Sequence, residues 1–326
     1  MKINVYGVGN ALVDLQVQVS DEILARTGFE KGIMTLVDDE QQRELLDQIS
    51  QLPRNQCAGG SAANTIVGIA DLGGSVAYCG KVSQDAMGEF FLADMNALGV
   101  NVDVTAAAEG PTGTCVVLIT PDAQRTMLTN LGVSATLTPE DIDEQQLRQA
   151  DYVYVEGYLL TGETTRAAAY RAMELAAEHG VRIALTASDP FLVNMIRDEI
   201  WQLIEGPVDL FFCNEEEALG LTESKDPVDS LHAIHQHVEN VAVTLGANGS
   251  MVMHQGELVS VEGVEVEAVD TTGAGDMYAG GLLYGVTNGM DWKQAGRLAS
   301  HCAARVVSQL GARLAEKMTP EQIEAL

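Results

Sequence analysis

The segment that most constrains the fold of this chain is the heptad Asp-Thr-Thr-Gly-Ala-Gly-Asp at residues 270–276, which runs directly into the apolar segment 277–284. The pattern predicts a glycine-rich turn that opens an apolar helix. The first N–H groups of a helix have no partner within the helix and lie at the positive end of its dipole. Gly273 and Gly275 have no side chains, so their N–H groups can converge on one point. The sequence therefore predicts an anion-binding turn, and a phosphoryl group in transfer is its natural occupant.

Asp276, the last residue of this heptad, is the candidate catalytic base. Phosphoryl transfer to an alcohol needs an acceptor for the hydroxyl proton beside the anion. In this interpretation Asp276 takes the proton, while the N–H groups of Gly273, Ala274 and Gly275 hold the charge of the transferring group. A carboxylate at a helix N-terminus is expected to ionise readily and to be a modest base. The plain alternative is a capped helix after a loop.

A second glycine-rich motif, Gly-Gly-Ser-Ala-Ala-Asn-Thr at 59–65, leads into the apolar segment 66–74. The two motifs, in this order and at this separation, resemble the two signatures of the ribokinase-like (PfkB) family of sugar and nucleoside kinases. The resemblance covers nearly the whole chain and is closest to the adenosine kinases of that family. There the Gly-Gly turn feeds a helix whose early Asn faces the substrate. The resemblance thus implies substrate contacts for Gly59, Gly60 and Asn64.

Strand-like and helix-like segments alternate along the chain. The expected strands are 3–8, 76–79, 152–155, 181–186, 208–212 and 241–245, and the expected helices are 63–72, 88–98, 164–179, 275–287 and 292–308. Such alternation predicts an α/β fold with a mostly parallel central sheet flanked by helices, and the resemblance implies its ribokinase-like form. Without repeats or a long linker, residues 1–326 are expected to form a single kinase domain.

Two segments, about 12–37 and 112–131, interrupt this alternation. The second has the apolar–polar alternation of two short strands around a turn at 121–123. We expect both segments to be β-like and to form a small sheet over the strand ends. The resemblance implies that this sheet is a lid. Its closure would exclude water, which otherwise competes as a phosphoryl acceptor.

The motif Gly-Asn-Ala-Leu-Val-Asp at 9–14 resembles a first-strand motif of adenosine-kinase-like proteins. There the Asp binds the ribose hydroxyls and the Asn frames the substrate, which implies these roles for Asp14 and Asn10. A carboxylate can accept hydrogen bonds from two vicinal hydroxyls, and Asn64 offers both a donor and an acceptor. Tyr158 is the candidate aromatic wall for a purine; the alternative is a core tyrosine with its hydroxyl at the surface.

The run Asn-Glu-Glu-Glu at 214–217 follows an apolar strand and matches the family's Asn-x-x-Glu, which is associated with Mg²⁺ and phosphate placement. One turn of helix puts Asn214 and Glu217 on the same face. Mg²⁺ keeps much of its hydration shell, so contact with Glu217 is expected to run through water. A solvated helix start is the alternative.

Two further segments resemble ATP-contacting parts of the family. The strand and turn at 243–250 imply contacts from Thr244, Gly246 and Gly249, with a simple hairpin turn as the alternative. Arg125, in the expected lid, resembles an arginine that reaches the phosphates in adenosine kinases. Its alternative is a surface arginine on a β-ribbon.

Charge and composition exclude several classes of function. The chain has 47 acidic and 18 basic residues, a net charge of -29, which disfavours nucleic-acid binding. No apolar run approaches a membrane span, and the first residues are strand-like and unlike a signal peptide. The five cysteines form no Cys-x-x-Cys pair. We therefore expect a cytoplasmic protein with reduced thiols and no membrane partner.

These observations lead to one prediction and two alternatives. The predicted activity is transfer of the γ-phosphoryl of MgATP to the 5′-hydroxyl of a nucleoside, with adenosine, giving AMP, as the leading substrate. The first alternative is a PfkB-type sugar kinase acting on ribose, fructose or 2-keto-3-deoxygluconate. The second is a non-catalytic relative that binds nucleoside or ATP. A keto acid would need a further cation at the sugar site, for which the sequence offers only Arg54 and Arg125. The resemblance leaves open a need for K⁺, and a monomer or a homodimer paired through the lids.

Overall fold

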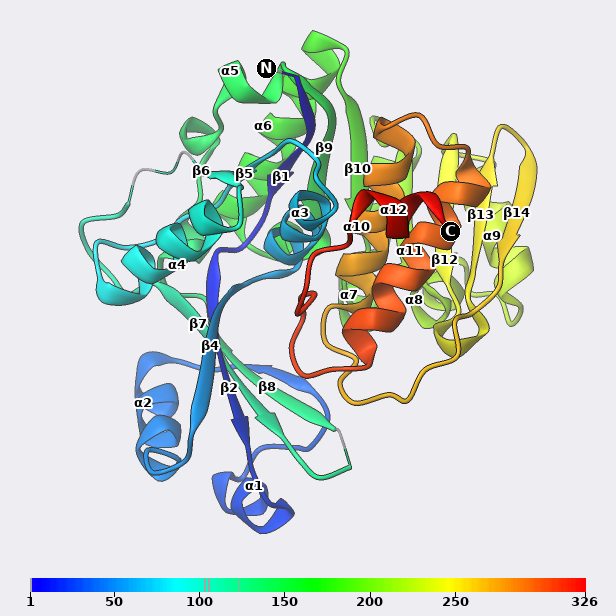
Figure 1. Ribbon diagram of the computed structural model, residues 1–326. Helices are drawn as coiled ribbons and strands as arrows, with labels where there is room; N and C mark the ends of the chain where they lie inside the picture. The colour runs from blue at the N-terminus through cyan, green and yellow to red at the C-terminus, as the bar shows by residue number, and fades with distance from the viewer. Residues whose placement is uncertain (1, 103, 105, 123) are drawn as a thin grey trace.

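The computed structural model describes residues 2–102, 104, 106–122 and 124–326, and its largest element is a nine-stranded sheet (Figure 1). From one edge to the other, its strands are β14 (Glu257–Val261), β13 (Ser250–His254), β12 (Asn240–Thr244), β11 (Leu210–Asn214), β10 (Arg182–Thr186), β9 (Ala150–Glu156), β1 (Ile3–Val8), β5 (Val76–Cys79) and β6 (Asn101–Val102). The pairs β12–β13 and β13–β14 are antiparallel, and all other pairs are parallel.

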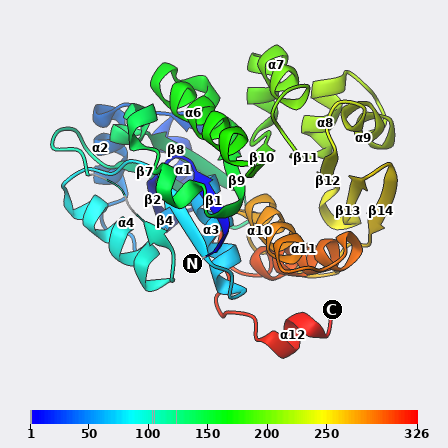
Figure 2. The ribbon, with the colours of Figure 1, turned by 90° about the horizontal axis from the view of Figure 1, so that it is seen from above.

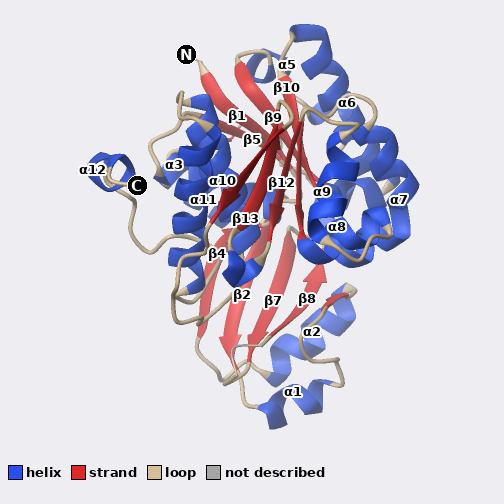
Figure 3. Cartoon of the chain, turned by 90° about the vertical axis from the view of Figure 1, so that its right-hand side faces the viewer, coloured by secondary structure: helices blue, strands red, loops and turns tan. Residues whose placement is uncertain are grey.

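Helices cover both faces of this sheet, as Figures 2 and 3 show. One layer contains α3 (Ser61–Asp71), α10 (Ala274–Thr287) and α11 (Trp292–Val307), and the other contains α6 (Glu163–His179), α7 (Pro190–Ile204), α8 (Glu215–Thr222) and α9 (Pro227–His235). Further helices are α4 (Ala86–Ala97), α5 (Glu144–Leu147) and the C-terminal α12 (Pro320–Glu324). The mostly parallel, helix-flanked sheet predicted from the alternation is confirmed. None of the described helices has the length and apolar character needed to cross a membrane.

The burial of the central strands explains their sequences. In β9, Ala-Asp-Tyr-Val-Tyr-Val-Glu, every residue except Asp151 is buried. A parallel strand covered by helices on both faces needs apolar side chains on both sides, so it shows a continuous apolar run and no alternation. The strand ends with Glu156, whose burial has another cause that is described below.

A second, five-stranded sheet lies below the first in Figure 1. Its order is β3 (Met34–Leu36), β8 (Arg125–Asn130), β7 (Gly113–Ile119), β2 (Leu12–Gln18) and β4 (Arg54–Gly59). The parallel pairing of β2 with β7 brings together the two segments that were expected to share a small sheet. The strands on either side of the expected turn at 121–123 are β7 and β8; residue 123 itself lies outside the described residues.

Two details of this small sheet differ from the prediction. Within 12–37, the part from Asp21 to Thr27 is helix α1, because Ser20 caps its first turn and Gly28 ends it in the left-handed region at φ 78°. The strand β4 lies outside the predicted bounds. Its polar sequence, Arg-Asn-Gln-Cys-Ala-Gly, lacks the alternation that would have identified it. Helix α2 (Asp39–Gln48) also belongs to this part of the molecule (Figure 3).

Two short junctions connect the sheets. Strand β1 ends at Val8 and β2 begins at Leu12, so the chain crosses from the large to the small sheet within three residues. On the way back, β4 ends at Gly59 and α3 begins at Ser61. Both junctions lie at the carboxyl end of β1, where the large sheet meets the small one.

Candidate active site

The carboxyl ends of the parallel strands bring most of the predicted residues to one edge of the large sheet. Asn10 follows β1, Glu156 ends β9, and Asn214 and Thr244 end β11 and β12 as partners in register. Open α/β sheets bind ligands at this edge. Candidate substrate residues and candidate ATP residues therefore both lie along the carboxyl edge of the large sheet.

Asp276 lies where the N-terminal turns of α3 and α10 meet. Its Oδ1 accepts a hydrogen bond from Ser61 Oγ at 2.7 Å, and its Oδ2 accepts one from Asn64 Nδ2 at 3.0 Å. Asn64 Oδ1 is buried and has no hydrogen-bond partner among the described residues. The two signature motifs, more than 200 positions apart, thus form a single cluster. It presents an oriented carboxylate and an open acceptor.

The pKa of Asp276 corrects one expectation. Burial raises the pKa of this carboxyl to about 6, although the hydrogen bonds from Ser61 and Asn64 lower it. Desolvation therefore outweighs the helix N-terminus, which was expected to keep the group readily ionised. At pH 7 the carboxylate form still predominates. A pKa nearer the working pH makes the group a better base than an exposed aspartate.

The turn before α10 has the predicted geometry with one difference. Gly273 takes a left-handed conformation, φ 71°, at the N-cap. The amides of Gly273, Gly275 and Asp276 donate to no described acceptor, whereas that of Ala274 bonds the carbonyl of Thr271 at 3.3 Å. Three free amides at a helix N-terminus suit a phosphoryl group.

Asp270 and Arg125 connect the small sheet with this turn. Buried Asp270 accepts from Thr272 N–H at 2.9 Å and from Gly311 N–H at 2.9 Å, and its Oδ1 lies 3.1 Å from Arg125 Nε. Arg125 also donates from Nη2 to Thr271 Oγ1 at 3.3 Å. Arg125 is therefore at the anion turn. The role of Asp270 was not foreseen, although an Asp two residues before a Thr is a common turn signal.

Asp14 and the glycine pair, which were predicted to bind the sugar, lie close together. Asp14 is buried in β2, and no described residue donates a hydrogen bond to its carboxyl group. A Cβ on Gly59 would lie 2.4 Å from that carboxyl, and one on Gly60, at φ 102°, would lie 2.0 Å from the carbonyl oxygen of Asn10. Only glycine permits both approaches. Burial raises the pKa of Asp14 to about 7.

Glu156 holds the two junctions together, a role that the sequence analysis missed. Its Oε1 accepts from the backbone N–H of Asn10 at 2.8 Å and from Asn10 Nδ2 at 2.7 Å, while Oε2 accepts from Ala62 N–H at 2.8 Å. Burial raises its pKa to about 7. A carboxylate that ends an apolar strand was the available signal, since a buried charge needs such partners.

Asn214 and Glu217 cap helix α8 reciprocally. Asn214 Oδ1 accepts from Glu217 N–H, and the Glu217 carboxylate accepts from the N–H and Nδ2 of Asn214 at 2.8 and 3.0 Å. Burial raises the pKa of Glu217 to about 7, and Asp189 adds to the rise. Since both oxygens are already engaged, the carboxylate suits contact with a hydrated Mg²⁺ better than direct ligation. Among the described residues, no three His, Cys, Asp or Glu side chains gather as a direct metal site.

The remaining predicted residues lie at or after the ends of strands β12 and β9, at the carboxyl edge of the large sheet. Thr244 ends β12, and a 3₁₀ turn at Gly246–Asn248 connects it to β13. This is the hairpin turn of the alternative interpretation, and contact with a nucleotide there stays a prediction. Tyr158 follows β9, and its hydroxyl lies 3.4 Å from both Ser188 O and Asp189 Oδ2.

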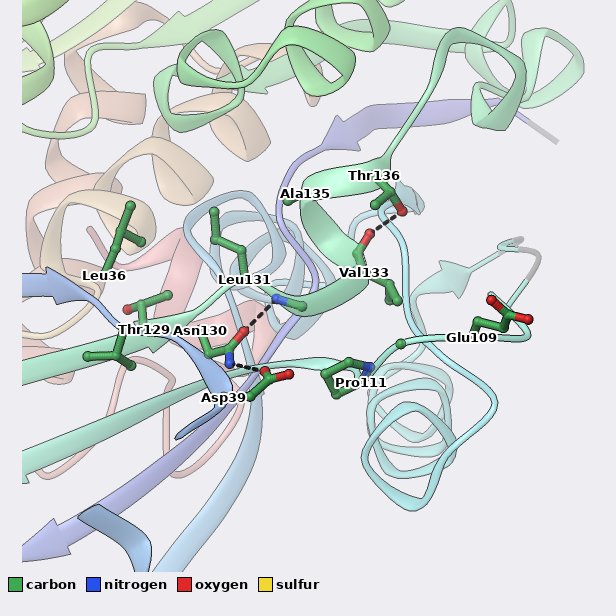
Figure 4. Close-up of a pocket in the computed structure, with 13 residues that line it drawn as sticks. Leu36, Asp39, Glu109, Pro111, Thr129, Asn130, Leu131, Val133, Ala135 and Thr136 are labelled. Carbon is green, nitrogen blue, oxygen red and sulfur yellow. Dashed lines mark hydrogen bonds between the residues drawn. The ribbon is translucent and has the colours of Figure 1, made fainter. Parts of the chain in front are cut away.

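A pocket of about 460 Å³ opens at the end of strand β8 (Figure 4). Leu36 and Thr129 of the small sheet line it, together with Leu131 and the 3₁₀ helix Gly132–Thr136. In that helix Ser134 Oγ donates to Asn10 Oδ1 at 2.9 Å. Ser134 itself does not line the pocket, so it stands between the pocket and Asn10.

The fold, together with buried carboxylates beside the free amides of a helix N-terminus, fits a class of small-molecule kinases. Residues 33–318 match the family model of pfkB family carbohydrate kinases, and the chain belongs to this family. Its enzymes are phosphotransferases that act on hydroxyl groups of sugars and nucleosides.

Similar proteins bear names from both branches of the family. The crystal structure of an adenosine kinase from Sinorhizobium meliloti is 37% identical, with a TM-score of 0.93 and complete coverage of both chains. A fructokinase from Vibrio alginolyticus is 32% identical over 83% of this chain and 91% of its own. An adenosine kinase from Saccharomyces cerevisiae is 28% identical over 93% and 94%. These likenesses leave the acceptor substrate to be argued from the site.

Proposed function

We propose that this protein transfers the γ-phosphoryl group of MgATP to the 5′-hydroxyl of a nucleoside, with adenosine, giving AMP, as its principal substrate. The observation that carries the proposal is the acceptor side of the site. Asp14 offers a carboxylate without hydrogen-bond donors, and Asn64 offers a buried acceptor oxygen without a partner. Buried polar groups are rarely left unpaired. Two vicinal hydroxyls of a ribose would satisfy both.

The reacting groups follow from the same geometry. The hydroxyl to be phosphorylated loses its proton to Asp276, which Ser61 and Asn64 hold in place. The free amides of Gly273 and Gly275 stabilise the charge on the transferring group, because they are fixed before the reaction. In a loose transition state the proton leaves late, so a base with a pKa of about 6 suffices.

The nucleotide would extend along the carboxyl edge toward Asn214, Thr244, Gly246 and Gly249. Arg125 would exchange part of its contact with Asp270 for the phosphates, closing the small sheet as a lid. Mg²⁺ neutralises phosphate charge when it is bound. Glu217 would hold it through water.

A nucleobase is the best-fitting occupant of the pocket at the end of β8. Leu36, Leu131 and Val133 supply apolar walls, and Thr129 with Asn130 supply polar atoms for specificity. A free ribose or fructose would leave this space to water. Adenosine is favoured over a sugar for this reason.

The sugar-kinase alternative is favoured by the fructokinase relative, with one restriction. Arg125 is paired with Asp270, and Arg54 is exposed at the far end of β4. A third cation, Arg313, acts electrostatically on Asp14. Its Nη1 is paired with Asp94 and its Nη2 with the Ala58 carbonyl, so both terminal nitrogens are engaged and only the buried Nε has no partner among the described residues. A keto acid is therefore less well served than a neutral polyol.

The deciding experiment is ADP release from MgATP with adenosine, inosine, guanosine, cytidine, ribose, fructose and 2-keto-3-deoxygluconate. Strongest turnover with adenosine and formation of AMP support the proposal. Turnover confined to a free sugar keeps the chemistry of Asp276 and overturns the base pocket. Ligand binding without turnover anywhere in the panel favours a non-catalytic relative.

The same assay with and without KCl, using choline chloride to hold ionic strength, tests whether the activity needs K⁺. Sedimentation at two protein concentrations distinguishes a monomer from a homodimer paired through the small sheets, whose edge strands are β3 and β4.

A further inference from the structure

Three consecutive residues of the C-terminal loop contact three different parts of the site. Gly311 N–H donates to Asp270 Oδ2 at 2.9 Å. Ala312 is buried against Gly273, where an added Cβ would lie 2.6 Å from its methyl group. Arg313 extends toward the small sheet. The loop therefore touches the anion turn and the sugar-binding strands at once.

Arg313 joins this loop to helix α4 and strand β4. Its Nη1 lies 2.8 Å from Asp94 Oδ2, and its Nη2 donates to the carbonyl of Ala58. The same Asp94 oxygen accepts from Ala58 N–H at 3.0 Å. The Arg313 side chain is only 12% exposed. A partly buried, charge-assisted bridge of this kind is much stronger than a surface ion pair.

The anchored strand is the one that borders Asp14. Ala58 is paired with Val13 in the antiparallel register of β2 and β4, and Gly59 approaches the Asp14 carboxyl too closely to carry a side chain. A shift of β4 would therefore move the wall against which Asp14 lies. Arg313 fixes the position of β4 through its bond to Ala58, and it belongs to the same loop whose Gly311 and Ala312 contact Asp270 and Gly273.

The charge of Arg313 acts on Asp14 as well. Burial raises the pKa of Asp14 and the Arg313 charge opposes this rise; Asp276 of α10 adds to the rise, and Arg125 of β8 opposes it. The neighbouring strands also bring the thiols of Cys57 and Cys115, whose own pKa values burial raises to about 12, so both stay neutral. Arg313 is thus the largest favourable influence on the ionised form of Asp14.

We infer that Arg313 is a positioning residue for the acceptor substrate: it anchors β4 to the C-terminal loop and keeps the Asp14 carboxylate in place and ionised for the vicinal hydroxyls. The inference rests on the proposed function, since it assumes that Asp14 binds the acceptor. It assigns no contact between Arg313 and the substrate.

Three variants distinguish the effect of the Arg313 charge from the effect of the bridge between Arg313 and Asp94. Arg313→Gln removes the charge and the bridge. Asp94→Asn breaks the same ion pair but leaves the arginine charge near Asp14. Arg313→Lys keeps the charge and loses the two-pronged geometry. Lys317→Gln is the matched control, because Lys317 lies on the following segment, is 57% exposed and pairs with Asp71 away from the site.

The measurement is the dissociation constant of adenosine between pH 6 and 9 without ATP, together with kcat and the KM for ATP. Adenosine affinity should fall at low pH as Asp14 takes up a proton, and this fall is the acidic limb of the binding curve. Arg313→Gln should move the midpoint of the limb up by about one pH unit, as expected for a carboxylate that loses a nearby opposite charge. Binding at pH 7 then weakens about fivefold, because roughly half of Asp14 is ionised at its pKa and about a tenth one unit below it. The KM for ATP should stay within about twofold, because Arg313 contacts α4 and β4 and no candidate ATP residue.

The direction of the limb decides the inference. Arg313→Lys should restore the wild-type limb, and Asp94→Asn should leave it unchanged or move it to lower pH. An upward shift in Asp94→Asn equal to that in Arg313→Gln would overturn the inference, since the arginine charge, which Asp94→Asn keeps, would then have no part in keeping Asp14 ionised. Equal losses for adenosine and ATP would do the same.

A failure of the proposed function is distinguishable because it appears in the wild type. If wild-type protein phosphorylates a sugar instead, the same pH series is run with that sugar. If it binds no acceptor, thermal unfolding of the unliganded variants gives the test. The deficit of Arg313→Gln relative to wild type should widen from about pH 6 to 8, because its folded state retains the Asp14 proton longer. A constant deficit over that range contradicts the inference.

Discussion

Asn64 Nδ2 lies 3.0 Å from Asp276 Oδ2, while the Oδ1 of the same Asn64 amide is buried without a partner. One side chain therefore orients the proposed base and offers an acceptor to the substrate. Ser61, one turn earlier on α3, contacts the other oxygen of Asp276 and supplies orientation alone. The two residues should consequently respond differently to removal.

Asn64→Ala should lower kcat/KM by roughly 10- to 100-fold, the equivalent of about 1.5–3 kcal/mol for a hydrogen bond to a charged group. Both kcat and the acceptor affinity should fall, because base orientation and substrate contact are lost together. Ser61→Ala should keep the acceptor KM within about twofold and lower kcat. Steady-state kinetics with varied adenosine distinguish the two, and a Ser61→Ala variant that loses affinity as strongly as Asn64→Ala would disprove the division of roles.

Asp276→Asn should reduce turnover by about 10²–10⁴-fold while adenosine still binds. The asparagine can keep partners in Ser61 and Asn64, and it removes a buried charge whose pKa is raised to about 6. A carboxyl group with a raised pKa destabilises the folded state once it ionises, so the variant should unfold at or above the wild-type temperature at pH 8. Activity assays and calorimetry of the same preparation check both statements. An active, less stable variant would remove Asp276 from the role of base.

The sequence predicted the structure best at positions where the backbone conformation requires one residue type, as a positive φ requires glycine. Gly60 and Gly273 both adopt positive φ, and both were recognised from motifs whose glycines have to turn the chain. The alternation of apolar segments likewise predicted the large sheet, since parallel strands buried on both faces are strongly apolar. Strand β4 escaped prediction because its polar residues gain their pairing partner from β2, more than 35 positions earlier in the chain.

The buried carboxylates were harder to interpret. Glu156 and Asp270 lie at the ends of local segments, but their functions depend on donors from Ala62 and Gly311, which only the tertiary fold supplies. The same holds for Arg313, which the sequence did not place beside Asp14. Charge balance along the chain says nothing about which charges meet.

The pH dependence should have two separate acidic limbs. Turnover at saturating substrate should fall as pH drops through about 6, where Asp276 takes up its proton, and acceptor affinity should fall through about 7, the pKa of Asp14. Stability has the opposite sign. Groups with raised pKa values bind more protons when folded, so the unliganded protein should lose stability as pH rises from about 4 to 7. Kinetics and unfolding in the same buffers check this, and a common limb for kcat and affinity would contradict separate roles.

Gly275 offers a test of the anion turn that does not depend on ionisation. A Cβ at Gly275 would meet no atom within 4 Å, so Gly275→Ala should fold normally. In the first turn of α10 the alanine should raise stability by up to about 1 kcal/mol. The methyl group would nevertheless stand at the free amides, crowding the phosphoryl group. We expect turnover to fall at least about tenfold and the KM for ATP to rise.

Gly220→Ala in α8 is the matched control, because its Cβ would make only ordinary contacts at 3.6 Å or more. That variant should gain similar stability and keep full activity. If Gly275→Ala is as active as Gly220→Ala, the amides of this turn do not bind the transferring group.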